Sequence, residues 1–116
     1  MDQKSKPIDP KLIATPFSYT DLVAYQEGSV VSRTVIEKPV GTVTVFAFDK
    51  GEKLSTHSAP YDALLQVIEG SGRITIEDKV FNIAAPGVII MPANRPHAVE
   101  AAEKFKMALI MIRQKD

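Results

Sequence analysis

From Val30 onward, the sequence alternates apolar and polar residues in short β-rich runs that Gly, Pro, Asp or Asn separate. Successive side chains of a β-strand point to opposite faces, so a period of two predicts strands and not helices. Short strands at close intervals, with turn residues between them, are typical of an all-β sandwich or barrel, here with about eight or nine strands. We predict a loop at 55–62 and strands at 30–37, 42–48, 63–68, 73–76, 80–83, 88–91, 97–101 and 105–113.

Two of these runs, Val88–Met91 and Met107–Ile112, are apolar at both parities. A strand with that composition is covered on both of its faces. A small closed barrel with a second buried surface outside it, such as a dimer interface, provides this cover. The sequence therefore predicts a jelly-roll barrel that forms a homodimer.

The N-terminal residues differ from the barrel in composition. Residues 1–16 hold three prolines and many polar residues, which predicts an irregular arm ordered by docking on the rest of the chain. Ser18–Gly28 begins with residues that favour helix N-caps and ends with Gly, which predicts a short helix of about two turns. The expected organisation is an arm with a short helix over residues 1–29, packed on a barrel over residues 30–116.

Charge and composition argue against several classes of protein. Lys and Arg number 14, as do Asp and Glu, so no net field attracts nucleic acid or an anionic membrane, and neither is an expected partner. The chain has no Cys, which excludes thiolate metal sites and fits a reducing compartment, so the expected location is cytoplasmic. No apolar run has the length of a signal peptide or of a membrane span.

Two local motifs resemble the signature motifs of the cupin superfamily. The first begins at Gly51, reaches His57 after five intervening residues and ends at Gly70. The second, GVIIMPANRPH, runs from Gly87 to His97, and 16 residues separate the two motifs. The resemblance implies a cupin double-stranded β-helix, or jelly-roll barrel, which is often dimeric and has a pocket at its centre.

The resemblance also implies a set of metal ligands, which this sequence matches only in part. Cupins usually bind a divalent metal through a first His, a second His two residues later, a Glu a few residues on and a third His in the second motif. His57 matches the first His and His97 matches the third. The second His position falls on Ala59, and the Glu position falls on Ala63 or Leu64. Catalytic zinc and non-haem iron sites use three protein ligands, so we expect no cofactor, or a weakly held divalent metal.

The candidate residues of a ligand-binding pocket are His57, Tyr61, Met91 and His97. Each has a structural alternative, because the histidines can be satisfied core residues, Tyr61 a loop residue at the barrel mouth and Met91 a core filler. Met107 and Met111 would extend a soft apolar lining. If the barrel closes as the motifs imply, His57 and His97 converge on one pocket, where an imidazole can act as acid or base near neutral pH.

Three functions remain open at this point. The favoured hypothesis is a cupin without a complete metal site that binds a small molecule in its pocket, as a sensor, carrier or accessory factor. The second is a metal-free enzyme that uses His57 and His97 as acid and base to isomerise or epimerise a sugar-like or small carbonyl substrate. The third is a metal-dependent oxygenase, isomerase or lyase in which the two histidines and a further ligand hold the metal.

Overall fold

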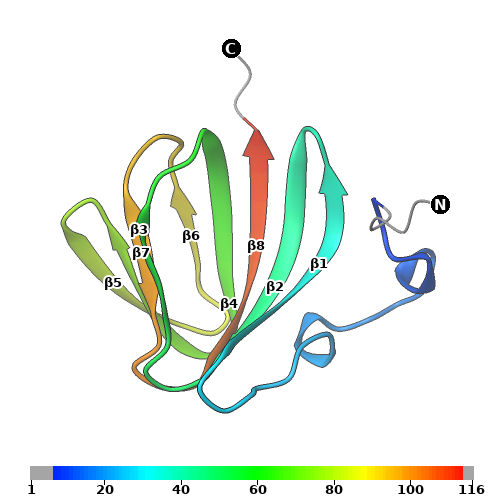
Figure 1. The fold of residues 1–116 in the computed structure, drawn as a ribbon, viewed down its shortest axis with the longest axis horizontal. Coiled ribbons are helices and arrows are strands. Elements are labelled where there is room, and N and C mark those ends of the chain that lie inside the picture. The colour runs from blue at the N-terminus through cyan, green and yellow to red at the C-terminus, as the bar shows by residue number, and fades with distance from the viewer. Residues whose placement is uncertain (1–6, 114–116) are drawn as a thin grey trace.

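The computed structural model describes residues 7–113, which form an antiparallel β-barrel (Figure 1). The predicted all-β fold is thereby confirmed. Residues 1–6 of the predicted arm and residues 114–116 of the predicted barrel lie outside the described residues. The strands are β1 (Val30–Lys38), β2 (Gly41–Phe48), β3 (Lys53–His57), β4 (Tyr61–Ile76), β5 (Lys79–Ala84), β6 (Val88–Met91), β7 (His97–Glu100) and β8 (Phe105–Arg113).

The strands make two antiparallel sheets that share β4 (Figure 1). The large sheet contains, in order, β1, β2, β8, the first part of β4 and β6. The small sheet contains β5, the second part of β4, β7 and β3. Because the two sheets are joined through one strand, they curl around a common interior, which is the jelly-roll arrangement expected from the sequence.

Two predictions about the strands are wrong. The segments 63–68 and 73–76, predicted as two strands with a turn between them, belong to one continuous strand, β4. The predicted loop 55–62 is partly strand, because β3 runs to His57 and β4 begins at Tyr61. The sequence of β3, KLSTH, has a single large apolar residue, so its strand character comes from pairing with β7 and not from a local pattern.

A bend at Gly70 explains why β4 resembled two strands. Gly70 has a φ of 74°, in the left-handed region that L-residues with a side chain rarely adopt. A Cβ atom there would also lie 2.6 Å from the carbonyl oxygen of Lys104. The β4–β8 register shifts next to it, between Val67 and Glu69. Gly70 therefore lies at a β-bulge, which bends β4 from the large sheet into the small one. It does not lie in a turn that reverses the chain.

The helix predicted over Ser18–Gly28 is also wrong. Within residues 7–113 the only helical segments are two three-residue 3-10 turns, η1 (Pro10–Leu12) and η2 (Tyr19–Asp21), and neither is long enough to cross a membrane. Tertiary packing overrides helix propensity here, because the arm places its apolar side chains on the outer face of the large sheet. The arm residues in this cluster are Leu12, Tyr19, Leu22, Val23 and Tyr25.

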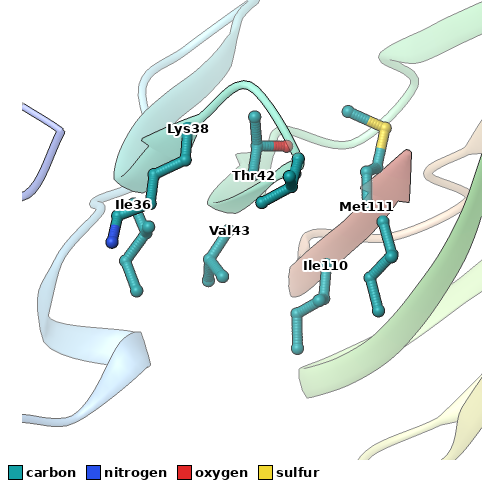
Figure 2. Close-up of a pocket in the computed structure, with 9 residues that line it drawn as sticks. Ile36, Lys38, Thr42, Val43, Ile110 and Met111 are labelled. Carbon is teal, nitrogen blue, oxygen red and sulfur yellow. The ribbon is translucent and has the colours of Figure 1, made fainter. Parts of the chain in front are cut away.

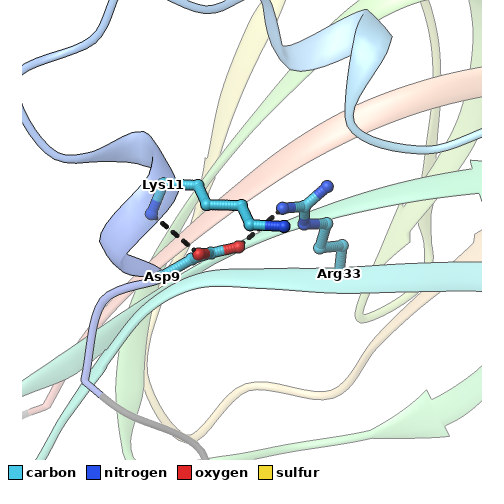
Figure 3. Close-up of polar contacts among 3 residues, drawn as sticks. All are labelled: Asp9, Lys11 and Arg33. Carbon is cyan, nitrogen blue, oxygen red and sulfur yellow. Dashed lines mark hydrogen bonds and ion pairs between the residues drawn. The ribbon is translucent and has the colours of Figure 1, made fainter.

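Polar contacts fasten the arm to the barrel. Asp9 accepts a hydrogen bond from the backbone N–H of Lys11 at 3.0 Å and another from Nη2 of Arg33, on β1, at 2.8 Å (Figure 3). The bond from the Lys11 backbone, followed by that from Arg33, holds the pKa of Asp9 below its ordinary value. Further along the arm, the Tyr25 hydroxyl donates to Glu69 of β4 at 2.6 Å. The arm is thus held on the large sheet both near its start and near its end.

Large buried apolar side chains fill one end of the barrel. The rings of Phe48 and Phe105 stack with centroids 4.7 Å apart and planes inclined by 12°, and neither side chain has exposed surface. Leu65, Val67 and Ile74 are also fully buried. We call this the closed end of the barrel, where the strands of the large sheet converge in Figure 1, and the opposite end the open end.

Candidate functional site

The barrel interior is hollow toward its open end. The cavity has a volume of about 180 Å³, and residues of both sheets bound it. Apart from two imidazoles and one phenol, its walls are apolar. The lining residues are Phe46, Leu54, His57, Ala59, Tyr61, Ala63, Met91, His97, Val99, Met107, Leu109 and Met111.

His57 and His97 lie side by side in this cavity. Their Cα atoms pair directly in the β3–β7 ladder. The ring centroids are 4.5 Å apart, and the ring planes are inclined by 66°. His97 is buried, with 9% of its surface exposed, whereas His57 is exposed. The structure therefore brings the two histidines together, with His57 toward solvent and His97 toward the interior.

Backbone carbonyl groups orient both imidazole rings. Nδ1 of His57 lies 2.9 Å from the carbonyl oxygen of Ser55, and Nδ1 of His97 lies 3.2 Å from that of Arg95. A carbonyl oxygen only accepts hydrogen bonds, so Nδ1 carries the proton in each neutral ring. The lone pair of each neutral ring is then on Nε2. The two histidines thus offer two Nε2 acceptors, or two metal-binding nitrogens, within one cavity.

The buried position of His97 favours its neutral form. Burial lowers the pKa of His97 below its ordinary value of 6.5; the hydrogen bond to the Arg95 carbonyl raises the pKa, and the nearby His57 lowers it. Desolvation is the largest of these effects because a charged imidazolium loses hydration inside an apolar cavity. At neutral pH, His97 is therefore a hydrogen-bond acceptor through Nε2.

The other two candidate residues, Tyr61 and Met91, also line the cavity. So do Ala59 and Ala63, the two positions at which the resemblance implied missing ligands. Sequence reasoning missed several wall residues, which come from strands that meet only in the folded barrel. These residues are Phe46, Leu54, Val99 and Leu109. The signal that could have found Phe46 and Leu109 is the period-two alternation of β2 and β8, whose ladder pairs Phe46 with Met107.

Two sheets that share a strand and enclose a pocket with one histidine from each motif define a single-domain cupin barrel. The chain belongs to the cupin family, because the family model described as "Cupin domain" matches residues 44–113. This range extends from β2 to the end of β8 and includes every residue that lines the cavity.

Solved structures with this fold come from several bacteria. A conserved protein of unknown function from Streptococcus pyogenes is 31% identical with a TM-score of 0.86, over 99% of this chain and 100% of that chain. A cupin 2 conserved barrel domain protein from Leptotrichia buccalis is 42% identical with a TM-score of 0.81, over 84% of this chain and 47% of that chain. A cupin superfamily protein from Desulfitobacterium hafniense, 23% identical with a TM-score of 0.84, shares the fold. No curated protein matches the sequence.

The side chains at the pocket do not fit the divalent metal that the family commonly binds. Within residues 7–113, no three or more His, Cys, Asp or Glu side chains form a group that could hold a metal ion. Asp62 is exposed, and its Oδ1 accepts a hydrogen bond from the backbone N–H of Ala93 at 2.9 Å. Glu100 is also exposed and lies 3.6 Å from Arg73. Neither carboxylate completes the three-ligand set that zinc or non-haem iron requires.

Proposed function

We propose that the barrel binds a small, largely apolar molecule that carries a hydrogen-bond donor. The observation that supports this proposal is the pair of Nε2 acceptors, from His57 and His97, set in an otherwise apolar cavity. Ligand pockets are mostly apolar, with a few polar groups that fix the orientation of the ligand. A ring packs against the apolar walls while its donor group binds Nε2.

The size of the cavity limits the ligand. Apolar protein cavities of about 150 Å³ stay dry and hold benzene, and this cavity measures about 180 Å³. The ligand that the cavity encloses is therefore about as large as one substituted six-membered ring. Binding of such a molecule without a chemical step suits a sensor, a carrier or an accessory factor.

Phenol and anisole provide a direct test, because they share a ring and only phenol donates a hydrogen bond. Each is titrated into the protein, and binding is followed by the NMR signals of the methionine methyl groups and the histidine rings. We expect phenol to shift the signals of Met91 and His97 and to bind about threefold to tenfold more tightly than anisole, the difference that one net hydrogen bond makes. Absence of shifts at the cavity, or equal affinities for the two probes, would refute the proposal.

Two variants separate the acceptor from the cavity. His97→Phe keeps a ring of similar size and removes Nε2, so phenol should lose its advantage over anisole. Val80→Ala, an exposed position on β5 that does not line the cavity, is the matched control and should bind both probes as the wild-type protein does. A His97→Phe variant that still prefers phenol would show that Nε2 of His97 is not the acceptor.

A second candidate is a metal-free proton-transfer enzyme, which the close approach of the two imidazoles favours. Such an enzyme would remove and return a proton next to the carbonyl group of a small sugar-like substrate. In deuterated water it would exchange the α-protons of dihydroxyacetone, and His97→Ala would abolish the exchange. A binding protein leaves the uncatalysed rate unchanged, which is the result we expect.

We also propose that the protein is a homodimer joined through the outer face of the large sheet. Strand registers align one apolar residue from each of five strands across that face. This apolar row consists of Ile36, Val43, Ile110, Leu64 and Ile90. Figure 2 shows Ile36, Val43 and Ile110 on the same side of the sheet, at a groove of about 240 Å³. Leu64 is 38% and Ile90 63% exposed, so the β4 and β6 part of the row is open to a partner.

Charges beside the apolar row favour a second copy of the same chain as the partner. Two residues further along the same strands, a second row of paired residues crosses the sheet. It runs from Lys38 on β1 through Gly41 and Ile112 to Asp62 on β4, so its β1 end is basic and its β4 end is acidic. A two-fold axis over the middle of this row places Lys38 opposite the partner's Asp62. The surface is therefore complementary to itself in charge as well as apolar.

Light scattering at micromolar concentration tests the dimer. We expect a mass twice the 12.7 kDa of one chain. Ile112→Lys places a charge at an exposed position of the proposed interface and should give the mass of one chain. Val80→Lys makes the same kind of change at a residue 56% exposed on β5 and should remain dimeric. A wild-type mass of one chain, or dissociation of Val80→Lys alone, would overturn the proposal.

A further inference from the structure

Three of the four methionines in the chain line the cavity that holds the two histidines. Met91 and Met107 are almost fully buried, at 2% and 1% exposure, and Met111 packs against the same core cluster. Methionine fills irregular spaces, but its thioether sulfur is also a soft metal ligand. Three methionines beside two imidazoles can therefore have a role in metal binding as well as in packing.

Two of the methionines surround the position where the carboxylate ligand is missing. Ala63 of β4 pairs with Met91 of β6 on one side and with Met111 of β8 on the other. Residues opposite each other on neighbouring strands have Cβ atoms about 5 Å apart, so both methionine side chains flank the space above the Ala63 methyl group. In Figure 2 the Met111 side chain leaves β8 on the side opposite Ile110, which is the side of the barrel interior.

The charge of this cavity selects against a divalent ion. The described residues that line it offer two imidazoles, three thioethers and the Tyr61 hydroxyl as possible donors, and none of these residues is Asp or Glu. Burying an uncompensated charge in an apolar site costs free energy that rises steeply with the charge of the ion. A monovalent ion therefore fits these walls better than a divalent one, and Cu(I) is a monovalent ion that binds soft thioether ligands.

We propose that His57, His97, Met91 and Met111 form a binding site for Cu(I). Nε2 of each histidine is left available by the bond that Nδ1 makes to a backbone carbonyl, an arrangement that also fixes metal-binding imidazoles in other proteins. The thioethers of Met91 and Met111 supply soft donors from the opposite strands. Cu(I) accepts a low coordination number, so the loss of the carboxylate ligand does not prevent its binding. The mostly apolar walls supply few of the harder oxygen ligands that stabilise Cu(II).

This site differs from the small-molecule site in its ligand, but both use the same nitrogens. The two proposals can consequently be separated in one protein. Replacing Met by Leu removes sulfur with little change in volume, so it should weaken Cu(I) binding much more than phenol binding. His97→Phe should weaken both, because both use Nε2 of His97.

The experiment is an anaerobic titration of the full chain with Cu(I), in the presence of ascorbate and of bicinchoninate, a coloured chelator that competes for Cu(I). We expect one equivalent of Cu(I) to transfer to the protein, and X-ray absorption of the complex to show both sulfur and nitrogen neighbours. Met91→Leu and Met111→Leu should each weaken the affinity by at least about tenfold, and the double variant by more. Zn(II) offered in the same way should compete poorly with Cu(I).

Met107→Leu is the matched control, because Met107 lines the same cavity but pairs with Val67 and not with Ala63. It changes the same wall without removing a proposed sulfur ligand, so it should weaken Cu(I) binding much less than Met91→Leu or Met111→Leu does. Circular dichroism of each variant checks that the fold is retained. The proposal is overturned if the wild-type protein takes no Cu(I) from the chelator, if Zn(II) binds as tightly, or if Met107→Leu loses as much affinity as Met91→Leu and Met111→Leu.

Discussion

The closed and open ends of the barrel are built from the same strands but filled differently. At the closed end, Phe48 and Phe105 stack and leave no exposed surface. At the open end, Ala59 and Ala63 line a cavity of about 180 Å³. Figure 1 shows the strands of the large sheet converging at one end and fanning apart at the other. The contrast leads us to expect that stability comes mainly from the closed end, whereas the proposed ligand binding belongs to the open end.

Side-chain size along single strands produces this difference. The inward-facing residues of β8 change from Phe105 at the closed end to Met111 at the open end, and those of β4 change from Leu65 to Ala63. No additional element is needed to make the pocket, because small side chains placed where strands diverge leave space. The two ends can therefore be altered independently by single substitutions.

The largest expected effect is that of Phe105→Ala at the closed end. Removing a fully buried ring that stacks on Phe48 should lower the free energy of unfolding by about 3–5 kcal/mol. Phenol affinity, measured where the variant is still folded, should change little. Phe81→Ala, at a position 38% exposed on β5, is the matched control and should cost about 1 kcal/mol or less. Loss of phenol binding in folded Phe105→Ala would contradict the division of roles between the two ends.

Gly72→Ala should have the next largest effect, through the same ring. A Cβ atom at Gly72 would lie 2.6 Å from Cε2 of Phe105, closer than packed carbon atoms approach. The ring cannot move away freely because it is stacked on Phe48. We expect a loss of about 1–3 kcal/mol in urea unfolding. In the Phe105→Ala background this penalty should disappear, and a penalty that persists would show that the clash lies elsewhere.

Ala63→Leu at the open end should have a small effect on stability and a large one on binding. The added isobutyl group occupies the cavity, so the gain from burial and the cost of crowding should nearly cancel, to within about 1 kcal/mol. Phenol and Cu(I) should both bind at least about tenfold more weakly. The reverse change at the next inward position of β4, Leu65→Ala, should instead cost about 2–5 kcal/mol and spare binding. Equal stability losses in the two variants would remove the basis of the comparison.

The sequence alone could predict most of the barrel because its apolar alternation is strong. The predicted strands 88–91 and 105–113 agree with β6 and β8 at both ends, and 30–37 agrees with β1 to within one residue. The helix over Ser18–Gly28 failed because local helix signals are weaker than the packing of the arm on the large sheet. The turn expected at Gly70 failed because the same residue type serves chain reversals and bulges.

The candidate site also has features that the sequence could predict and features that it could not. The proximity of His57 and His97 could be predicted from the resemblance of the two motifs to those of cupins, and the structure pairs the two residues directly. His57, expected in the loop 55–62, lies at the end of β3. The methionine neighbours of Ala63 could not be predicted, since they depend on the registers that join β6, β4 and β8. Long-range register is a property of the folded barrel, and no local pattern specifies it.

The smallest expected effect is the pH dependence that His97 adds to stability. Burial lowers the pKa of folded His97 below 6.5, so below about pH 6.5 the unfolded chain binds a proton more readily than the folded one. The contribution of His97 is therefore fully present above that pH and is lost as the pH falls through the pKa of the folded state. Urea unfolding at about pH 7.5 and about pH 5.5 should show a smaller loss of stability for His97→Phe than for the wild-type protein.

Asp9, in the N-terminal arm outside the barrel, provides a control for this pH dependence. Its pKa is lowered from 3.8, by the Lys11 backbone N–H first and Arg33 second. The stability it contributes is present above its unfolded pKa and is lost only below about pH 3.8. Asp9→Asn should therefore leave the change between about pH 7.5 and about pH 5.5 as large as in the wild-type protein. If His97→Phe kept that change as well, the protonation of His97 would not be linked to folding, and the open end would hold the imidazole in a more solvated position than its burial indicates.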